Sequence, residues 1–143
     1  MTIDQDKNER RFNRKVSEFS GHFMSNSKWL KLFKVISLHY PQIRRCLIID
    51  IYRDKSFEIV IPLSDQFDTV FYAKGIKDVL MGGPMLFKEI RWIEIPENWP
   101  EDVYTQFRNA PAQNLSNLEQ EINGIGEFVI ERGENSLKVF GYK

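Results

Sequence analysis

The chain of 143 residues carries 20 basic and 20 acidic side chains, 42% hydrophobic residues and a single cysteine. This length and apolar content are enough for one compact core, and they exclude disorder over the whole chain. A net charge of zero excludes the global positive field on which sequence-independent nucleic-acid binders rely, and Cys46 alone cannot form an internal disulfide. No apolar run is long enough to span a bilayer. We therefore expect a cytoplasmic protein with no membrane partner and no direct nucleic-acid partner.

Two helices are expected at the start of the chain. Phe12, Val16, Phe19 and Phe23 recur at intervals of four, three and four, which predicts an amphipathic helix from about residue 8 to 19. Gly21 then ends it. In residues 25–36 a serine-rich start offers an N-cap for a second helix, whose apolar side chains share one face. The residues of that face are Trp29, Leu32, Phe33 and Ile36.

Strands follow the proline at position 41. The β-branched segments 45–53 and 56–62 are separated by two residues, which predicts a hairpin. Residues 69–73 are expected to form a short strand, and residues 75–81 a helical turn before the break at Gly82, Gly83 and Pro84. In the stretch "GGPMLFKEIRWIEIP", residues 82–96, both the odd-numbered and the even-numbered positions carry apolar and charged side chains, so both faces of a strand would be mixed. This pattern predicts a bulged strand covered on both sides.

The last part of the chain reads as loops, one helix and a final hairpin. Ser116 is a candidate N-cap for a helix through Ile122, and residues 126–142 contain two alternating runs around "RGEN". Helices followed by strands that form hairpins predict an α+β fold, with two N-terminal helices packed on a mainly antiparallel sheet. We divide the chain into a helical extension, residues 1–24, and a single α+β domain, residues 25–143.

The sequence contains no clear catalytic constellation. There are two histidines, His22 and His39, and no Gly-x-Ser-x-Gly elbow, so nucleophilic catalysis lacks its usual signature. One cysteine with two histidines cannot form a cysteine-rich zinc site. A phosphate-binding loop needs glycines that lead into a helix, but the glycines at 82 and 83 lead into a predicted strand. We expect no metal and no cofactor.

Carboxylates in the predicted strands are the remaining catalytic candidates. Glu89, Glu94 and Asp50 could form an acid–base couple if burial separated their pKa values. Lys88 and Arg91 are adjacent cations, and Glu89 and Arg91 would share one face of a regular strand. We therefore favour structural ion pairing over catalysis in residues 82–96.

Charge is distributed unevenly along the chain. Residues 28–45 contain five basic side chains and no acid, whereas residues 97–134 contain eight acids and two arginines. An aromatic anchor ringed by acids suits a basic protein partner, and the competing interpretation, which we slightly favour for Trp99 itself, is a core residue beside a proline turn. The candidate partner-binding residues are Trp99, Glu97, Glu101, Asp102, Glu119 and Glu121.

Three segments carry a resemblance to a known family: "NSKWLKLF" at 26–33, residues 82–96, and "SLKVFGY" at 136–142. Together they resemble a family of small, uncharacterised bacterial proteins with a Lys-Trp, a Gly-Pro turn before a Lys-Glu-Ile-x-Trp-Ile-Glu-Ile strand, and an aromatic-Gly-Tyr ending. This sequence has Arg91 where that strand more often has an acid. The resemblance implies a bacterial cytosolic protein and supplies no catalytic residues.

Three functional hypotheses follow. The first is a non-enzymatic immunity protein that neutralises a cognate toxin by direct binding, by analogy with families of this size. The second is a small-molecule or peptide-binding module with a cleft between the sheet and the N-terminal helices. The third is a small enzyme based on Glu89, Glu94 and Asp50.

Overall fold

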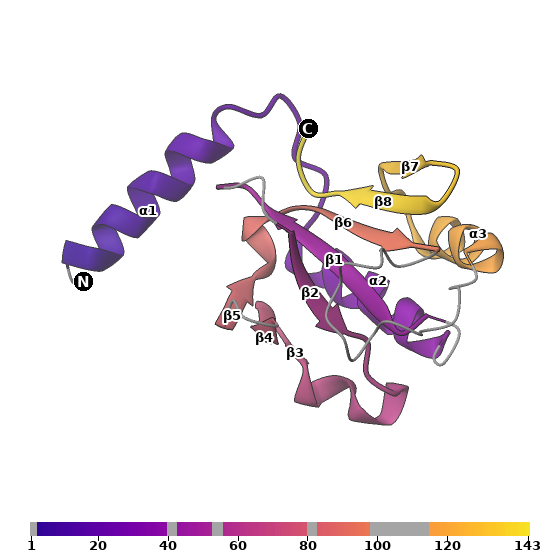
Figure 1. Cartoon of the computed structure of the whole chain (residues 1–143). Coiled ribbons are helices and arrows are strands. Elements are labelled where there is room, and N and C mark those ends of the chain that lie inside the picture. Colours follow the sequence, from indigo (N-terminus) through magenta and orange to yellow (C-terminus); the bar gives the residue numbers. More distant parts are fainter. Residues whose placement is uncertain (1–2, 40–42, 53–55, 80–82, 98–114) are drawn as a thin grey trace.

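The computed structural model describes residues 3–39, 43–52, 56–79, 83–97 and 115–143, without the side chains of residues 3–6 and 116. Strand pairing is antiparallel throughout these residues and forms two sheets (Figure 1). The larger has the order β2-β1-β6-β8-β7 and the smaller β3-β4-β5. The predicted α+β class is confirmed. The helices are α1 (Ile3–Val16), α2 (Asn26–Leu38) and α3 (Ser116–Ile125); the strands of the large sheet are β1 (Arg45–Asp50), β2 (Ser56–Val60), β6 (Ile90–Pro96), β7 (Ile130–Arg132) and β8 (Ser136–Phe140).

Helix α2 forms the centre of the core. The backbone amide of Lys28 donates a hydrogen bond to Ser25 Oγ at 3.2 Å, so Ser25 is the N-cap that the sequence predicts. The predicted apolar face is buried in one cluster with the inward side chains of the large sheet. Phe33 stacks on Phe71 at 4.6 Å and on Phe87 at 5.9 Å between ring centroids, so this helix also binds the smaller sheet to the core.

The smaller sheet corrects two sequence-based expectations. Its strands are β3 (Phe71–Tyr72), β4 (Gly75–Val79) and β5 (Gly83–Leu86). The expected helical turn at 75–81 is wrong where described: Ile76 and Val79 are three apart, as on a helix, but a register shift between them lets both be buried in a strand. The expected strand at 69–73 is shortened because the 3₁₀ helix η1 (Ser64–Thr69) precedes it.

Residues 82–96 do not form a single strand. The 3₁₀ turn η2 (Phe87–Glu89) separates β5 from β6, so the segment contributes one strand to each sheet. The backbone amide of Ile51 donates to the carbonyl of Glu89 at 2.9 Å, which holds η2 against the end of β1. The register of β1 against β6 shifts between Ile49 and Asp50, so the expected irregularity exists in this pair.

The last described residues are hydrogen-bonded to the segment that follows α1. The carbonyl of Lys143 accepts hydrogen bonds from the amides of Ser20 at 2.8 Å and Gly21 at 3.0 Å, and Lys143 donates to the carbonyl of Gly21. His22 forms an antiparallel bridge with Tyr142 and stacks on its ring at 4.7 Å. The segment after α1 is therefore fixed by the segment after β8.

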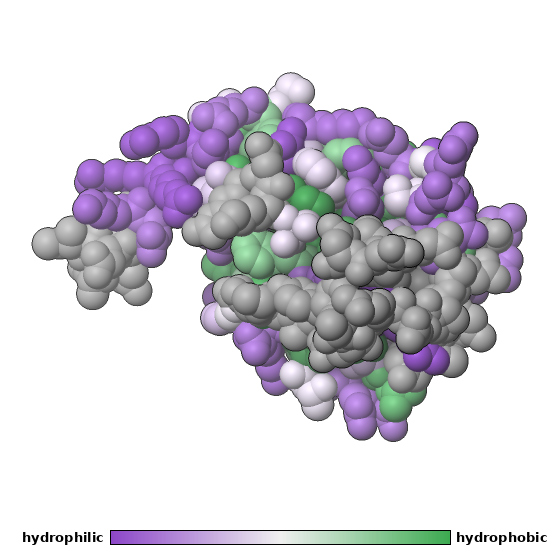
Figure 2. Space-filling model, viewed as in Figure 1, coloured by the Kyte–Doolittle hydropathy of each residue, from purple (hydrophilic) through white to green (hydrophobic). Residues whose placement is uncertain are grey.

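Helix α1 projects from the body (Figure 1). Its contacts with the body include side-chain contacts to Tyr52 and Lys88, near the end of β1. The helix begins earlier than expected, at Ile3, and ends at Val16. Just after this end, the amides of Glu18 and Phe19 donate hydrogen bonds to carbonyls three residues earlier, which tightens the chain. Phe19 thus lies in the following turn, against Tyr142 at 5.4 Å. In the same view, the outer surface of α1 is hydrophilic (Figure 2). None of the described helices combines the length and apolar character of a membrane-spanning segment.

The three segments that carry the family resemblance meet in space. A Cβ on Gly141 would lie 2.5 Å from the carbonyl oxygen of Ile90 and 3.1 Å from the ring of Trp29. The hydroxyl of Tyr142 donates to the carbonyl of Lys88 at 2.7 Å. Glycine at 141 is therefore required by the close approach of β6 and α2, and Tyr142 fixes the start of β6.

Candidate functional site

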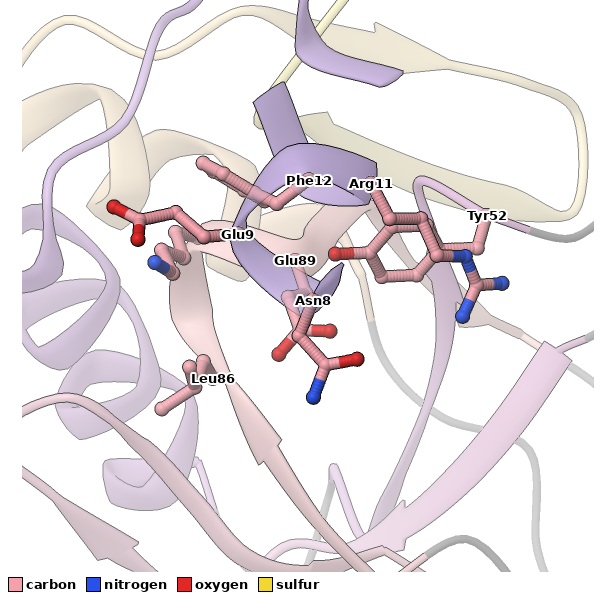
Figure 3. Close-up of a pocket in the computed structure, with 8 residues that line it drawn as sticks. Asn8, Glu9, Arg11, Phe12, Tyr52, Leu86 and Glu89 are labelled. Carbon is pink, nitrogen blue, oxygen red and sulfur yellow. The ribbon is translucent and has the colours of Figure 1, made fainter. Parts of the chain in front are cut away.

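A cavity of about 540 Å³ lies between α1 and the body of the protein (Figure 3). We call it the Glu89 cavity. Its walls come from α1, from the residue pair that follows β1, and from β5 and η2. It is lined by Asn8, Glu9, Arg11, Phe12, Tyr52, Leu86, Lys88 and Glu89.

Two cation–ring contacts position α1 over this cavity. The guanidinium carbon of Arg11 lies 4.3 Å from the ring centroid of Tyr52, and Lys88 Nζ lies 4.4 Å from that of Phe12. Each contact pairs a residue of α1 with one of the body, and Figure 3 shows Arg11, Phe12, Tyr52 and Glu89 around one hollow. Each such contact contributes about 0.5–1 kcal/mol of stabilisation at an exposed site, so the two contacts orient α1 only weakly against the body.

Tyr52 and Glu89 form the polar centre of the cavity. Both groups line the cavity, and each shifts the pKa of the other. Burial, followed by the charge of Glu89, raises the pKa of Tyr52 to about 12, so its hydroxyl stays protonated. Burial also raises the pKa of Glu89, and the charge of Lys88 opposes this rise. The cavity thus contains a carboxyl group that is easier to protonate than usual.

The carboxylates predicted as an acid–base couple are only partly brought together. Asp50 raises the pKa of Glu89 through its charge and accepts a hydrogen bond from the amide of Tyr52 at 3.0 Å. It is buried and does not line the cavity. Glu94 lies further along β6, where it pairs with Lys138 on β8 at 3.6 Å. Of the three, Glu89 alone lines the Glu89 cavity.

The expected pairing of Glu89 with Arg91 is wrong. The 3₁₀ turn η2 interrupts the alternation of the strand, so the two residues do not share a strand face. Glu89 lines the Glu89 cavity with Tyr52, whereas the Arg91 guanidinium lies 5.0 Å from the ring of Trp92 and 5.2 Å from that of Phe19. Among described residues, no carboxylate forms an ion pair with Arg91.

A second hollow, of about 420 Å³, adjoins the first, because Tyr52 lines both. We call it the Arg91 cavity. It lies between the end of α1, the end of β1 and the C-terminal segment. Its lining residues are Lys15, Glu18, Phe19, Ile51, Tyr52, Arg91 and Lys143.

The predicted partner-binding residues lie elsewhere. Glu119 points toward β7, where its carboxylate is 3.8 Å from Arg132 Nε, and Glu121 points toward the end of α2, where it meets His39 Nε2 at 2.8 Å. The two acids therefore occupy opposite flanks of α3. The amide of Glu97 donates to the carbonyl of Asn135 in the β7–β8 turn. The remaining candidates, Trp99, Glu101 and Asp102, lie outside the described residues.

Helix α3 itself differs from expectation at its start. Its N-cap is Leu115, which has no side-chain cap bond, so Ser116 is the first helical residue instead of the predicted cap. The buried side chains of Leu115, Leu118 and Ile122 hold the helix against the core. Tertiary burial thus fixes this helix start where the sequence suggested a polar cap.

Sequence reasoning did not identify Arg11 and Tyr52 as site residues. The available signal was the apolar stripe containing Phe12 and Val16 on an otherwise charged helix, since such a stripe needs a surface to cover. In the part of the chain that the structure describes, no group of three or more His, Cys, Asp or Glu side chains is placed to hold a metal ion.

Comparison with protein-family models, with curated proteins and with solved structures finds no match for this chain.

Proposed function

We propose that this protein is a non-enzymatic binding protein that holds a small molecule or a short peptide in the Glu89 cavity. The observation that carries the proposal is the cavity itself, whose volume of about 540 Å³ falls in the range of known ligand sites. It is formed where a charged, projecting helix meets the end of a sheet, and this position supports a ligand-binding role.

The lining chemistry supports recognition. Phe12, Tyr52 and Leu86 offer apolar contact, while Arg11 and Glu89 offer charge of both signs. Because the Tyr52 hydroxyl remains protonated beside the Glu89 carboxyl group, the pair provides polar groups among the apolar lining residues. Asp50 and Glu94 do not reach this cavity, so the acid–base couple expected from the sequence is not assembled there, and we favour ligand binding over catalysis by that couple.

A thermal-shift screen of metabolites and short peptides tests the proposal. A ligand at about 100 times its Kd stabilises the protein by about 2.7 kcal/mol, which is a rise in Tm of roughly 5–10 °C. Phe12→Ala should abolish the shift. Leu38→Ala, which changes an exposed side chain on α2, is the matched control and should keep it. A panel without a shift, or a shift that survives Phe12→Ala, contradicts the proposal.

The second candidate is an immunity protein that neutralises a cognate toxin. The acidic end of the domain favours it: Glu121 keeps 53% of its side chain exposed, and Glu131 and Glu134 are exposed on the neighbouring hairpin. Co-purification with the product of an adjacent gene tests it. Loss of that complex in Glu97→Gln/Glu121→Gln, but not in Phe12→Ala, would favour this candidate. The free, buried thiol of Cys46 fits a reducing cytoplasm in either case.

A further inference from the structure

The Arg91 cavity is rich in positive charge. Three of its lining residues are cations, Lys15, Arg91 and Lys143, and one is a carboxylate, Glu18. Lys15 Nζ lies 3.4 Å from the carboxylate of Glu18, and Lys143 Nζ lies 3.6 Å from that of Glu131, which does not line the cavity. Both pairs have side chains that are at least a third exposed, so solvent screens them and they hold the lysines weakly.

Arg91 differs from the two lysines in this cavity. It has no ion pair within the described chain, and its Nε atom is buried without a hydrogen-bond acceptor. The rings of Phe19 and Trp92, at 5.2 and 5.0 Å, hold its guanidinium group. A guanidinium that is already held in place loses less conformational entropy when it binds an anion. Its N–H groups can donate two parallel hydrogen bonds to the oxygens of a carboxylate or a phosphate.

The cavity is also built from fixed backbone. The carbonyl oxygen of Arg91 accepts from the amides of Gly141 at 2.7 Å and Tyr142 at 3.1 Å, and Lys143 is held to Gly21. Tyr52 forms the wall shared with the Glu89 cavity, and its hydroxyl stays protonated because burial and the charge of Glu89 raise its pKa to about 12. The cations thus surround the hollow from β6, from the C-terminal segment and from α1.

We propose that the Arg91 cavity binds an anionic group, a phosphate or a carboxylate, with Arg91 as its main contact and Lys15 and Lys143 as supporting charges. Because the two cavities share Tyr52, a ligand of the Glu89 cavity that carries such a group would place it here. This extension rests on the proposed function, whereas anion binding at Arg91 itself does not.

The experiment titrates the full chain with inorganic phosphate and, separately, with acetate. The readout is the arginine Nε–H signals in a ¹H–¹⁵N spectrum, with sodium chloride at matched ionic strength as the reference. The Arg91 signal, identified by its loss in Arg91→Lys, should shift saturably. A larger response to phosphate or to acetate tells which oxyanion the cavity prefers. A shift reproduced by chloride alone overturns the proposal, as does the absence of any saturable shift.

Variants locate the site. Because Arg91→Gln removes a charge-assisted hydrogen bond to the anion, it should weaken phosphate binding about tenfold or more. Binding is followed through tryptophan fluorescence, to which Trp92 beside Arg91 contributes. Lys15→Gln should weaken it less, and Lys31→Gln, on the exposed side of α2, should leave it unchanged. Arg91→Lys keeps the charge and provides a second variant if Arg91→Gln fails to fold. Equal weakening by Lys31→Gln and Arg91→Gln would show diffuse surface attraction and overturn the proposal.

The same variants separate this inference from the proposed function. Binding of phosphate that requires Arg91, together with a ligand screen that finds nothing dependent on Phe12, supports the anion site and contradicts the Glu89-cavity proposal. A ligand that depends on Phe12, together with phosphate binding that ignores Arg91, has the opposite meaning.

Discussion

Tyr52, two residues after β1, and Glu89, in η2, line the same cavity and shift each other's pKa. This relationship joins two segments that the sequence separates by 36 intervening residues, and Tyr52 stands at the boundary between the two cavities. Burial makes both groups harder to ionise. The pair is therefore a sensitive reporter of how closely α1 covers the body.

Glu89 should make stability fall as the pH rises. Its pKa in the folded protein is raised, mainly by burial, above the ordinary 4.5, so the folded state binds more protons than the unfolded state across that window. The stabilising contribution is complete below 4.5 and is lost as the pH rises through the folded pKa. Glu89→Gln should match the wild type at about pH 4 and be more stable at about pH 7 in urea unfolding.

Tyr52→Phe is the companion variant for that measurement. The hydroxyl lowers the pKa of Glu89 by bonding to its charged form, so its removal should move the loss of stability to higher pH. Parallel pH profiles for the wild type and Glu89→Gln would contradict the burial of this carboxyl group.

Gly141→Ala should destabilise the protein by about 1–3 kcal/mol, because the new methyl group would overlap the carbonyl of Ile90 and press on Trp29. Gly124→Ala is the matched control. A Cβ there meets no atom within 4 Å, and Gly124 lies in α3, so alanine should stabilise by about 0.5–1 kcal/mol. Chemical unfolding measures both. Equal effects of the two substitutions would show that β6 and α2 do not approach Gly141 this closely.

Phe33→Ala should cost about 3–5 kcal/mol, since the ring is fully buried and stacks on Phe71 and Phe87. Leu38, on the same helix, is 67% exposed, and Leu38→Ala should change stability by less than about 0.5 kcal/mol. Thermal unfolding of the two variants makes the comparison. A small loss for Phe33→Ala would mean that the smaller sheet is not held through α2.

Cys46 should be unreactive toward a thiol reagent such as DTNB in the native protein. The side chain is fully buried on β1, and burial raises the pKa of its thiol, so the reactive thiolate is scarce. One thiol should react after unfolding in urea. Rapid native labelling would indicate that the sheet opens locally at β1.

Local signals in the sequence predicted the elements that local rules determine. Ser25 and the apolar face of α2 were identifiable, as were the β1–β2 hairpin and the β7–β8 hairpin, because each depends on neighbouring residues. Strand β4 was not, since the spacing of Ile76 and Val79 fits a helix and its strand form depends on pairing with β5. The break at η2 likewise depends on contacts with the end of β1.

The candidate site was harder to predict for the same reason. Glu89 was recognised as a possible chemical group, but its partner Tyr52 lies on another element, and no sequence spacing connects them. The cleft beside the N-terminal helices was one of the expected possibilities, yet Arg11 and Arg91 received no role in it. The sequence indicates that α1 has an apolar face that must pack against another surface. It does not indicate that this surface contains Tyr52 and Glu89.

The bonds between Lys143 and residues 20–21 have a consequence for synthesis on the ribosome. Helix α1 emerges before the strands, but residues 20–21, which follow it, lack these partners until residue 143 has left the exit tunnel. The Arg91 cavity, which needs Lys143 as a wall, therefore forms only after residue 143 has emerged, and a shorter nascent chain lacks it however much of the sheet has already folded.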